Sequence, residues 1–291
     1  MNKRIFSSQL NVDIDTKGAE LLSIKNKINN TEYLWQGDEQ VWSKHAPVLF
    51  PVVGKLKNFS YKYNDEDFVL MQHGFAKDLE FKVTSEKENE ICMLLESNDI
   101  TMEYYPFKFA LLARYAVVDN LLTCEYVVTN LNNKIMPFSI GVHPGFKCPI
   151  DDSLDYSDYY LEFSSDEEFK QIILEGGIGK DERQHLNVPT GRKLDVSKDY
   201  FSGDAIVLDK PNSVAIRLKS DISSKCVTVG FPKVPYLGLW SKPLKNSYVC
   251  IEPWFGMSDF ESSNGNLEDK EGIQKLLPYQ VFQFKYTVKV E

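Results

Sequence analysis

The stretch VFQFKYTVKV, residues 281–290, decides the fold class. Successive side chains of a β-strand point to opposite faces, so a half-buried strand alternates apolar and polar residues. Here the apolar set recurs at every second position, at Phe282, Phe284, Tyr286, Val288 and Val290. The pattern predicts a half-buried strand that finishes the domain.

Working back along the chain, the same short strands recur, separated by turns. Residues 110–118 and 121–128 flank Asp119-Asn120, a pair suited to a tight turn, and predict a hairpin. Residues 82–84 and 91–95 flank the polar SEKENE and predict another. Residues 19–25 and 33–35, on either side of Asn29-Asn30, predict strand, turn and strand.

Helical signals are few. A short helix is expected from Ser165 to Leu174, before Gly176-Gly177, and another from Asp269 to Leu277. Neither is a long amphipathic helix, which argues against a parallel α/β sheet. Residues 151–158 and 175–199 are expected to be long surface loops. The sequence therefore predicts an all-β protein, one large antiparallel β-sandwich over residues 1–291.

Composition excludes several function classes. The chain of 291 residues has 33 Lys and Arg against 42 Asp and Glu, a net charge of −9, which disfavours nucleic-acid binding through phosphates. Its apolar runs are too short for a membrane span, and its start, MNKRIFSSQLNV, lacks the apolar stretch of a secretion signal. The five Cys contain no CxxC pair, which predicts reduced thiols in a cytoplasmic protein.

Three segments have the residues for chemistry. His73 in QHGFAK and His143 in GVHPGF each lie beside Gly or Pro, which predicts tight loops; a His that caps a turn is the structural alternative. Glu252 ends an apolar run and precedes Pro-Trp-Phe, where burial would raise its pKa and make it a better base. The alternative is a strand-end Glu paired with a surface Lys. The sequence contains neither a GxSxG nucleophile motif nor a phosphate-binding glycine loop with its Lys.

In order along the chain, several motifs resemble the aldose 1-epimerase (galactose mutarotase-like) family, and most closely its LacX-type branch, which is related to the hexose-6-phosphate epimerases. The motifs are FPVVGKL, QHGFAK, YPFKF, GVHPGF, FSGDAIVLDK, LGLWSKP and CIEPWFGMSD. The resemblance covers nearly the whole chain from about residue 10. It implies a large antiparallel β-supersandwich with long loops and few short helices, and an isomerase that interconverts sugar anomers without a metal or organic cofactor.

The resemblance also implies roles for residues. Glu252 of the Glu-Pro-Trp motif falls on the general base and His143 of the His-Pro motif on the general acid. His73 falls on a substrate-binding histidine, and Asp204, with Asp209 as the weaker choice, on a residue that binds sugar hydroxyls. Glu252 is expected to start ionised and His143 protonated, each favouring the charge of the other. Phe146, Trp240 and Trp254 are candidates for the apolar wall that sugars need, although ordinary core packing explains Trp240 equally well.

The phosphate question rests on two lysines. The branch commonly has Arg where this chain has Lys55 and Lys77, and in the hexose-6-phosphate members Arg near these places holds the phosphate. Lys binds phosphate as a point charge without the bidentate fork. We therefore expect a mutarotase for a free hexose, with a hexose-6-phosphate 1-epimerase using Lys55 and Lys77, or a non-catalytic sugar-binding protein, as alternatives. The expected partner is a small sugar, with no nucleic acid or membrane; a homodimer is compatible with the sequence.

Overall fold

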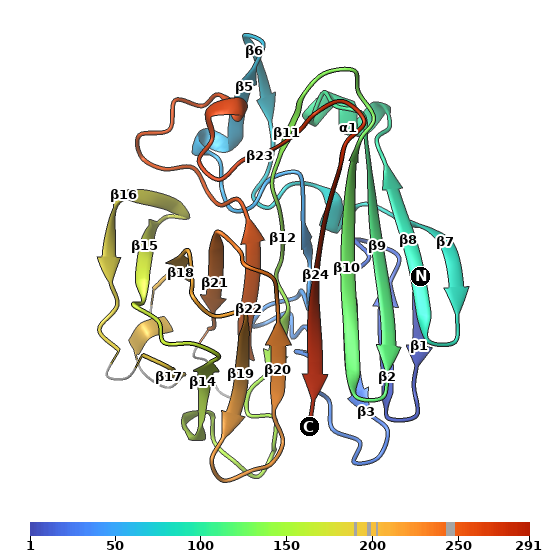
Figure 1. The fold of residues 1–291 in the computed structure, drawn as a ribbon, viewed down its shortest axis with the longest axis vertical. Coiled ribbons are helices and arrows are strands. Elements are labelled where there is room, and N and C mark those ends of the chain that lie inside the picture. Colours follow the sequence, from blue (N-terminus) through green and yellow to red (C-terminus); the bar gives the residue numbers. More distant parts are fainter. Residues whose placement is uncertain (189–190, 197–198, 202, 243–247) are drawn as a thin grey trace.

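The longest sheet of the computed structural model contains the strand that closes the chain (Figure 1). The model describes residues 1–188, 191–196, 199–201, 203–242 and 248–291. Nine strands form this sheet in the order β17 (Lys193–Asp195), β14 (Tyr159–Phe163), β19 (Ala215–Ser220), β20 (Val227–Gly230), β24 (Val281–Val290), β10 (Leu121–Asn130), β9 (Phe109–Val118), β8 (Glu90–Glu96) and β7 (Lys82–Lys87).

Alternating burial builds the centre of this sheet. In β9 and β10 every second side chain is buried, and in β24 the buried side chains are Phe284, Tyr286, Val288 and Val290. Figure 1 shows β24 beside β10, although the two are far apart in sequence. The predicted final strand and both predicted hairpins, β7–β8 and β9–β10, are confirmed. Residues 33–35 are not a strand; they make only an isolated bridge, between Leu34 and Phe146.

A second sheet contains the segment that ends in Glu252. Its order is β16 (Ile178–His185), β15 (Lys170–Glu175), β18 (Ile206–Asp209), β21 (Tyr236–Trp240), β22 (Tyr248–Phe255), β12 (Ile140–Val142) and β4 (Val48–Leu49), and β13 (Gly145–Lys147) also pairs with β22. Buried side chains of both large sheets, such as Leu111, Phe284 and Ile251, belong to one core cluster. All pairings between named strands are antiparallel, as in the predicted sandwich.

Smaller elements complete the fold. Three strands, β1 (Asn2–Phe6), β2 (Leu10–Asp15) and β3 (Leu21–Asn26), form a separate sheet, and β5 (Ser60–Tyr63) with β6 (Glu66–Val69) and β11 (Met136–Phe138) with β23 (Gln274–Leu276) form pairs. The described residues contain one α-helix, α1 (Asp99–Tyr104), and short 3-10 turns at Lys57–Phe59, Ala76–Asp78, Tyr156–Asp158, Asp199–Phe201 and Leu267–Asp269. None of these helices has the length and apolarity to cross a membrane.

Both predicted helices are wrong. The segment from Ser165 to Leu174 ends in β15, because Gly176 and Gly177, both with positive φ, turn the chain back into β16 as a hairpin. The segment from Asp269 to Leu277 ends in β23, which pairs with β11. The expected loop 175–199 therefore contains β16 and β17; its residues 189–190 and 197–198 lie outside the described part of the chain.

Candidate active site

Strand β22 presents Glu252 on the face opposite the main core. The strand is buried on both sides, so alternate residues face two different environments. Val249 and Ile251 belong to the main core, whereas Cys250 and Glu252 lie on the other face with Tyr248 and Trp254. The carboxylate side chain is only 1% exposed.

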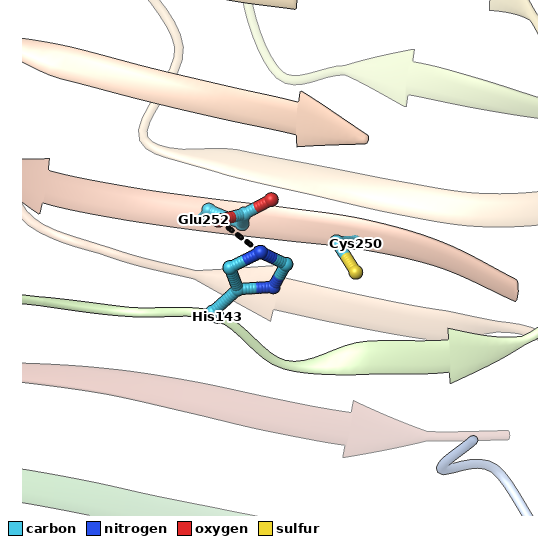
Figure 2. Close-up of side chains that lie close together, drawn as sticks. All are labelled: His143, Cys250 and Glu252. Atoms are coloured by element: carbon cyan, nitrogen blue, oxygen red, sulfur yellow. Dashed lines mark ion pairs between the residues drawn. The ribbon is translucent and has the colours of Figure 1, made fainter. Parts of the chain in front are cut away.

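A break in the neighbouring chain brings His143 to this carboxylate. Gly141 in β12 pairs with Trp254 and Gly145 in β13 pairs with Cys250, and in this shared register His143 falls opposite Glu252. His143 Nε2 lies 3.3 Å from Glu252 Oε2, and the dashed line in Figure 2 marks this ion pair. Neither Glu252 oxygen has a hydrogen-bond partner among the described residues, and the same holds for His143 Nδ1.

The pair lies at the wall of a cavity of about 380 Å³. Four of the residues predicted for the site line it together with the pair, namely His73, Lys77, Asp204 and Trp254. The other lining residues are Trp42, Lys44, Pro47, Gly54, Gln72, Leu174, Gly177, Ala205, Trp240 and Ser258. The cavity thus combines polar groups with indole surfaces, as is usual for a small-molecule site.

Burial favours the uncharged form of both members of the pair. Desolvation raises the pKa of Glu252 well above 4.5, opposed by the indole of Trp254. Desolvation, helped by His73, lowers the pKa of His143 well below 6.5. In this structure, burial therefore opposes the expected mutual stabilisation of the two charges. A buried ion pair of this kind loses more hydration energy than its attraction returns unless further hydrogen bonds satisfy it, and here the carboxylate has none.

His73 is held as a neutral donor. Its backbone has a positive φ of 66°, which the turn before Gly74 imposes. The N–H of Gly54 donates to His73 Nδ1 at 3.1 Å, so the ring proton lies on Nε2. Burial, with the positive charge of Lys77, lowers the pKa of His73 to about 4. Nε2 therefore carries a proton at neutral pH.

The structure distinguishes between the two aspartates. Asp204 lines the cavity, where its carboxylate accepts hydrogen bonds from the N–H groups of Gly177 and Ala205. Asp209 does not line it; its carboxylate lies 3.5 Å from Arg183 and 3.8 Å from Lys170. Geometry thus agrees with the preference for Asp204.

Of the two lysines predicted to bind phosphate, only Lys77 lines the cavity. Lys55 is not among the lining residues, and its Nζ donates to the carbonyl of Gly176 at 2.9 Å. Lys77 lines the cavity but donates to the carbonyl of Gly74 and pairs with Asp78. The second lining cation is Lys44, which the sequence did not single out.

Phe146 is a correction among the wall residues. It is completely buried in the main core, because Gly145 is the residue of β13 that faces Cys250 and Trp42. Trp240 and Trp254 do line the cavity. Sequence reasoning missed Trp42, since its approach to His143 depends on a loop that no motif marks. An aromatic residue three positions before His45 was the only signal.

Three described residues have the donor atoms for a metal. His143, Cys250 and Glu252 place one ligand atom each within 4.8 Å of one another (Figure 2). Burial raises the pKa of the Cys250 thiol well above 9.0, which disfavours the thiolate that a metal ion would need. The other two residues are the predicted acid and base.

Comparison with known proteins identifies the family and the fold of the chain. A model of the aldose 1-epimerase family matches residues 5–267. The chain is 34% identical to the chromosomal protein LacX of Lactococcus lactis subsp. lactis over 100% of this chain and 99% of that one. A galactose mutarotase related enzyme from Lactobacillus acidophilus has a TM-score of 0.93 at 33% identity, covering 100% and 97% of the two chains. A galactose mutarotase-like protein from Lactobacillus casei has a TM-score of 0.93 at 28% identity, covering 100% of both.

Proposed function

The chain belongs to the aldose 1-epimerase family, and we propose that it interconverts the α and β anomers of a free hexose or related aldose. One observation carries the proposal. A carboxylate and an imidazole lie 3.3 Å apart at the wall of a cavity, and both carboxylate oxygens lack hydrogen-bond partners among the described residues. The hydroxyl groups of a sugar are donors that would complete this site.

Ring opening needs one proton acceptor and one donor. Glu252 takes the proton of the O1 hydroxyl, the O1–H electron pair forms the C1=O1 bond, and the C1–O5 bond breaks while His143 donates its proton to O5. Rotation about the C1–C2 bond and the reverse transfers close the ring on the other face of C1. His73 Nε2 donates a hydrogen bond to the sugar, and Asp204 accepts one from a hydroxyl. Each proton transfer contributes about 10²–10⁴-fold.

The buried pair favours the opening step. Opening converts ionised Glu252 and protonated His143 into a protonated carboxyl and a neutral imidazole. This uncharged state is the one that burial stabilises. Hydrogen bonds from sugar hydroxyls stabilise the charged starting state, so the two states approach each other in free energy once the sugar is bound. When the two protonation states of the pair have similar free energies, the same site can catalyse both the opening and the closing of the sugar ring.

The charge balance of the cavity supports a neutral sugar. The two lining cations, Lys44 and Lys77, both contact Asp78, and Lys44 also lies 3.7 Å from Glu20. Each positive charge therefore has a carboxylate beside it, and little is left to attract a phosphate. This observation favours the free sugar over a hexose 6-phosphate.

Variants of the pair test the proposal. Glu252→Gln and His143→Asn should each slow anomer exchange by about 10²–10⁴-fold while sugar binding stays measurable by calorimetry. Matched controls are Glu261→Gln and His185→Asn, whose side chains lie outside the cavity lining and should keep the native rate. A native rate in either pair variant removes that residue from the mechanism. Sugar binding by the unmutated protein without acceleration would indicate a binding protein.

A further inference from the structure

The segment of residues 37–46 has no regular structure, yet it is fastened at several points. The carbonyl of Asp38 accepts the N–H groups of Val41 and Trp42 at 3.0 and 2.8 Å. The indole N–H of Trp35 donates to the carbonyl of Trp42 at 2.7 Å. Further along, the buried carboxylate of Glu20 accepts the N–H of His45 at 2.7 Å. These contacts fix the position of Trp42 at the cavity.

Trp42 packs on the imidazole of His143. Their ring centroids lie 4.9 Å apart with an interplanar angle of 33°. Trp240 meets the same imidazole edge-on, at 5.5 Å and 88°. The fit is close, because a Cβ added at Gly145 would lie 2.8 Å from the Trp42 ring. Trp42 and Trp240 also contact each other, with ring centroids 5.5 Å apart, so the two indoles form one aromatic wall beside His143.

We infer that packing against the indoles of Trp42 and Trp240 orients the imidazole of His143. A catalytic imidazole is commonly held by a hydrogen bond from its second ring nitrogen to a carboxylate or carbonyl. His143 Nδ1 has no such partner in the described part of the chain. We infer that the ring orientation that directs Nε2 at Glu252 comes from packing, and Trp42 makes the closer and less steeply inclined of the two indole contacts.

We propose that Trp42 is a positioning residue for proton transfer: its indole holds the His143 imidazole with Nε2 toward Glu252 and keeps water away from the ring. This inference rests on the proposed function for its effect on rate. The effect on the imidazole itself is independent of that function.

The charged and titratable groups that face His143 belong to elements other than the segment of Trp42. Strand β22 contributes Glu252, Cys250 and Tyr248, and the loop after β6 contributes His73. The remaining charged residues that line the cavity are Lys44, Lys77 and Asp204. Loss of the indole changes none of these charges directly. A change in the pKa of His143 would therefore report water entering beside the ring.

The test is a proton NMR titration of the His143 ring signal, assigned with His143→Asn, in Trp42→Ala and Trp42→Phe. Solvation in Trp42→Ala should raise the pKa of His143 toward 6.5, whereas Trp42→Phe keeps an aromatic face and should stay near the native value. Anomer exchange should show kcat falling about 10- to 100-fold in Trp42→Ala with a smaller change in KM, and recovering in Trp42→Phe.

Gly145→Ala gives an independent route if Trp42→Ala does not fold, because its methyl group pushes on the Trp42 ring while the indole remains. It should move the His143 pKa in the same direction. An unchanged His143 pKa in folded Trp42→Ala and Gly145→Ala would overturn the positioning role. A raised KM with unchanged kcat in Trp42→Ala would also overturn it, because Trp42 would then only bind the sugar. Absence of activity in the native protein would contradict the proposed function, while the titration would still decide this inference.

Discussion

Glu252 is a carboxylate within a strand that is otherwise apolar, and its burial has a measurable cost. Desolvation raises its pKa well above 4.5, so the folded protein keeps a proton that the unfolded chain releases at neutral pH. Stability from this group is therefore complete below pH 4.5 and declines as pH rises through the folded-state pKa. Burial of Glu252 thus lowers the stability of the fold at neutral pH but provides the site with a reactive carboxyl group.

Replacing this carboxylate should stabilise the protein at neutral pH. Glu252→Gln cannot ionise, so we expect its free energy of unfolding at pH 7.5 to exceed that of the native protein by about 1–2 kcal/mol. The difference should shrink toward zero at pH 4, below the unfolded-state pKa. Urea unfolding at the two pH values measures it, with the exposed Glu261→Gln as the control that changes little. A gain of equal size at both pH values would refute the desolvation account.

The pair should also give the rate a broad pH plateau. The active pair holds one proton, and its two titration steps belong to the pair as a whole. On the acid side, the pair gains a second proton on His143, and this step is shifted to lower pH because the pKa of His143 is lowered. On the basic side, the pair loses its single proton and Glu252 ionises, and this step is shifted to higher pH because the pKa of Glu252 is raised. We expect kcat/KM to be flat through pH 6.5, with the acid limb below it. A half-maximal rate at pH 6.5 would mean that His143 titrates as a solvated histidine.

At the scale of single residues, the sequence was most informative where chemistry and motif coincide. Glu252 and His143 were predicted and the structure brings them together. Phe146 was assigned to the wrong face, because a GVHPGF loop gives no period from which to read orientation. The family resemblance suggested that Lys55 binds phosphate, but its side chain donates a hydrogen bond to the carbonyl of Gly176 and does not line the cavity. Trp42 depends on a loop fastened by residues distant in sequence, so it could not be predicted.

Among the elements, the turn at Gly54 lies at the cavity and connects several segments. Gly54 has φ of +73°, and a Cβ there would lie 2.6 Å from the backbone nitrogen of Ser258. Its own N–H holds His73. The turn thus connects the FPVVGKL segment, the QHGFAK loop and the end of β22. Its shape should matter both for stability and for the site.

Two glycine variants separate strain from contact. Gly265 also has a positive φ, of +87°, but nothing lies within 4 Å of an added Cβ. We expect Gly265→Ala to cost about 1–2 kcal/mol of stability from backbone strain alone. Gly54→Ala should cost at least about 1 kcal/mol more because of the clash, and should lower kcat/KM. Thermal unfolding with an anomer-exchange assay compares them. Equal losses in both would show that the Ser258 contact is not tight.

Strands were more predictable than helices for a physical reason. Period-two burial in β9, β10 and β24 requires only a core on one side, and the sequence shows it directly. The polar residues before Lys170 and after Asp269 have composition that fits a helix cap or a turn equally. Pairing with a distant strand decided the outcome in both places. The secondary-structure propensity of a short segment contains no information about pairing with a strand that is distant in the sequence.

Over the whole molecule, the two ends of the chain belong to one core. The hydroxyl of Tyr33 donates to the carbonyl of Glu291 at 2.6 Å, and buried residues from β1 to β24 share a cluster. We therefore expect residues 1–291 to unfold in one cooperative transition, with tryptophan fluorescence and circular dichroism curves that coincide. Two separated transitions would indicate independent domains.

The central claim is that this protein catalyses anomer exchange of a free sugar. The most direct measurement is exchange NMR of the α and β anomers of glucose and galactose, with glucose 6-phosphate in parallel, in the presence of the native protein. The account predicts acceleration of at least one free sugar, and less acceleration of the phosphate because Lys44 and Lys77 already face carboxylates. Acceleration of the phosphate alone would contradict the free-sugar assignment, and no acceleration of any of the three sugars would contradict the claim.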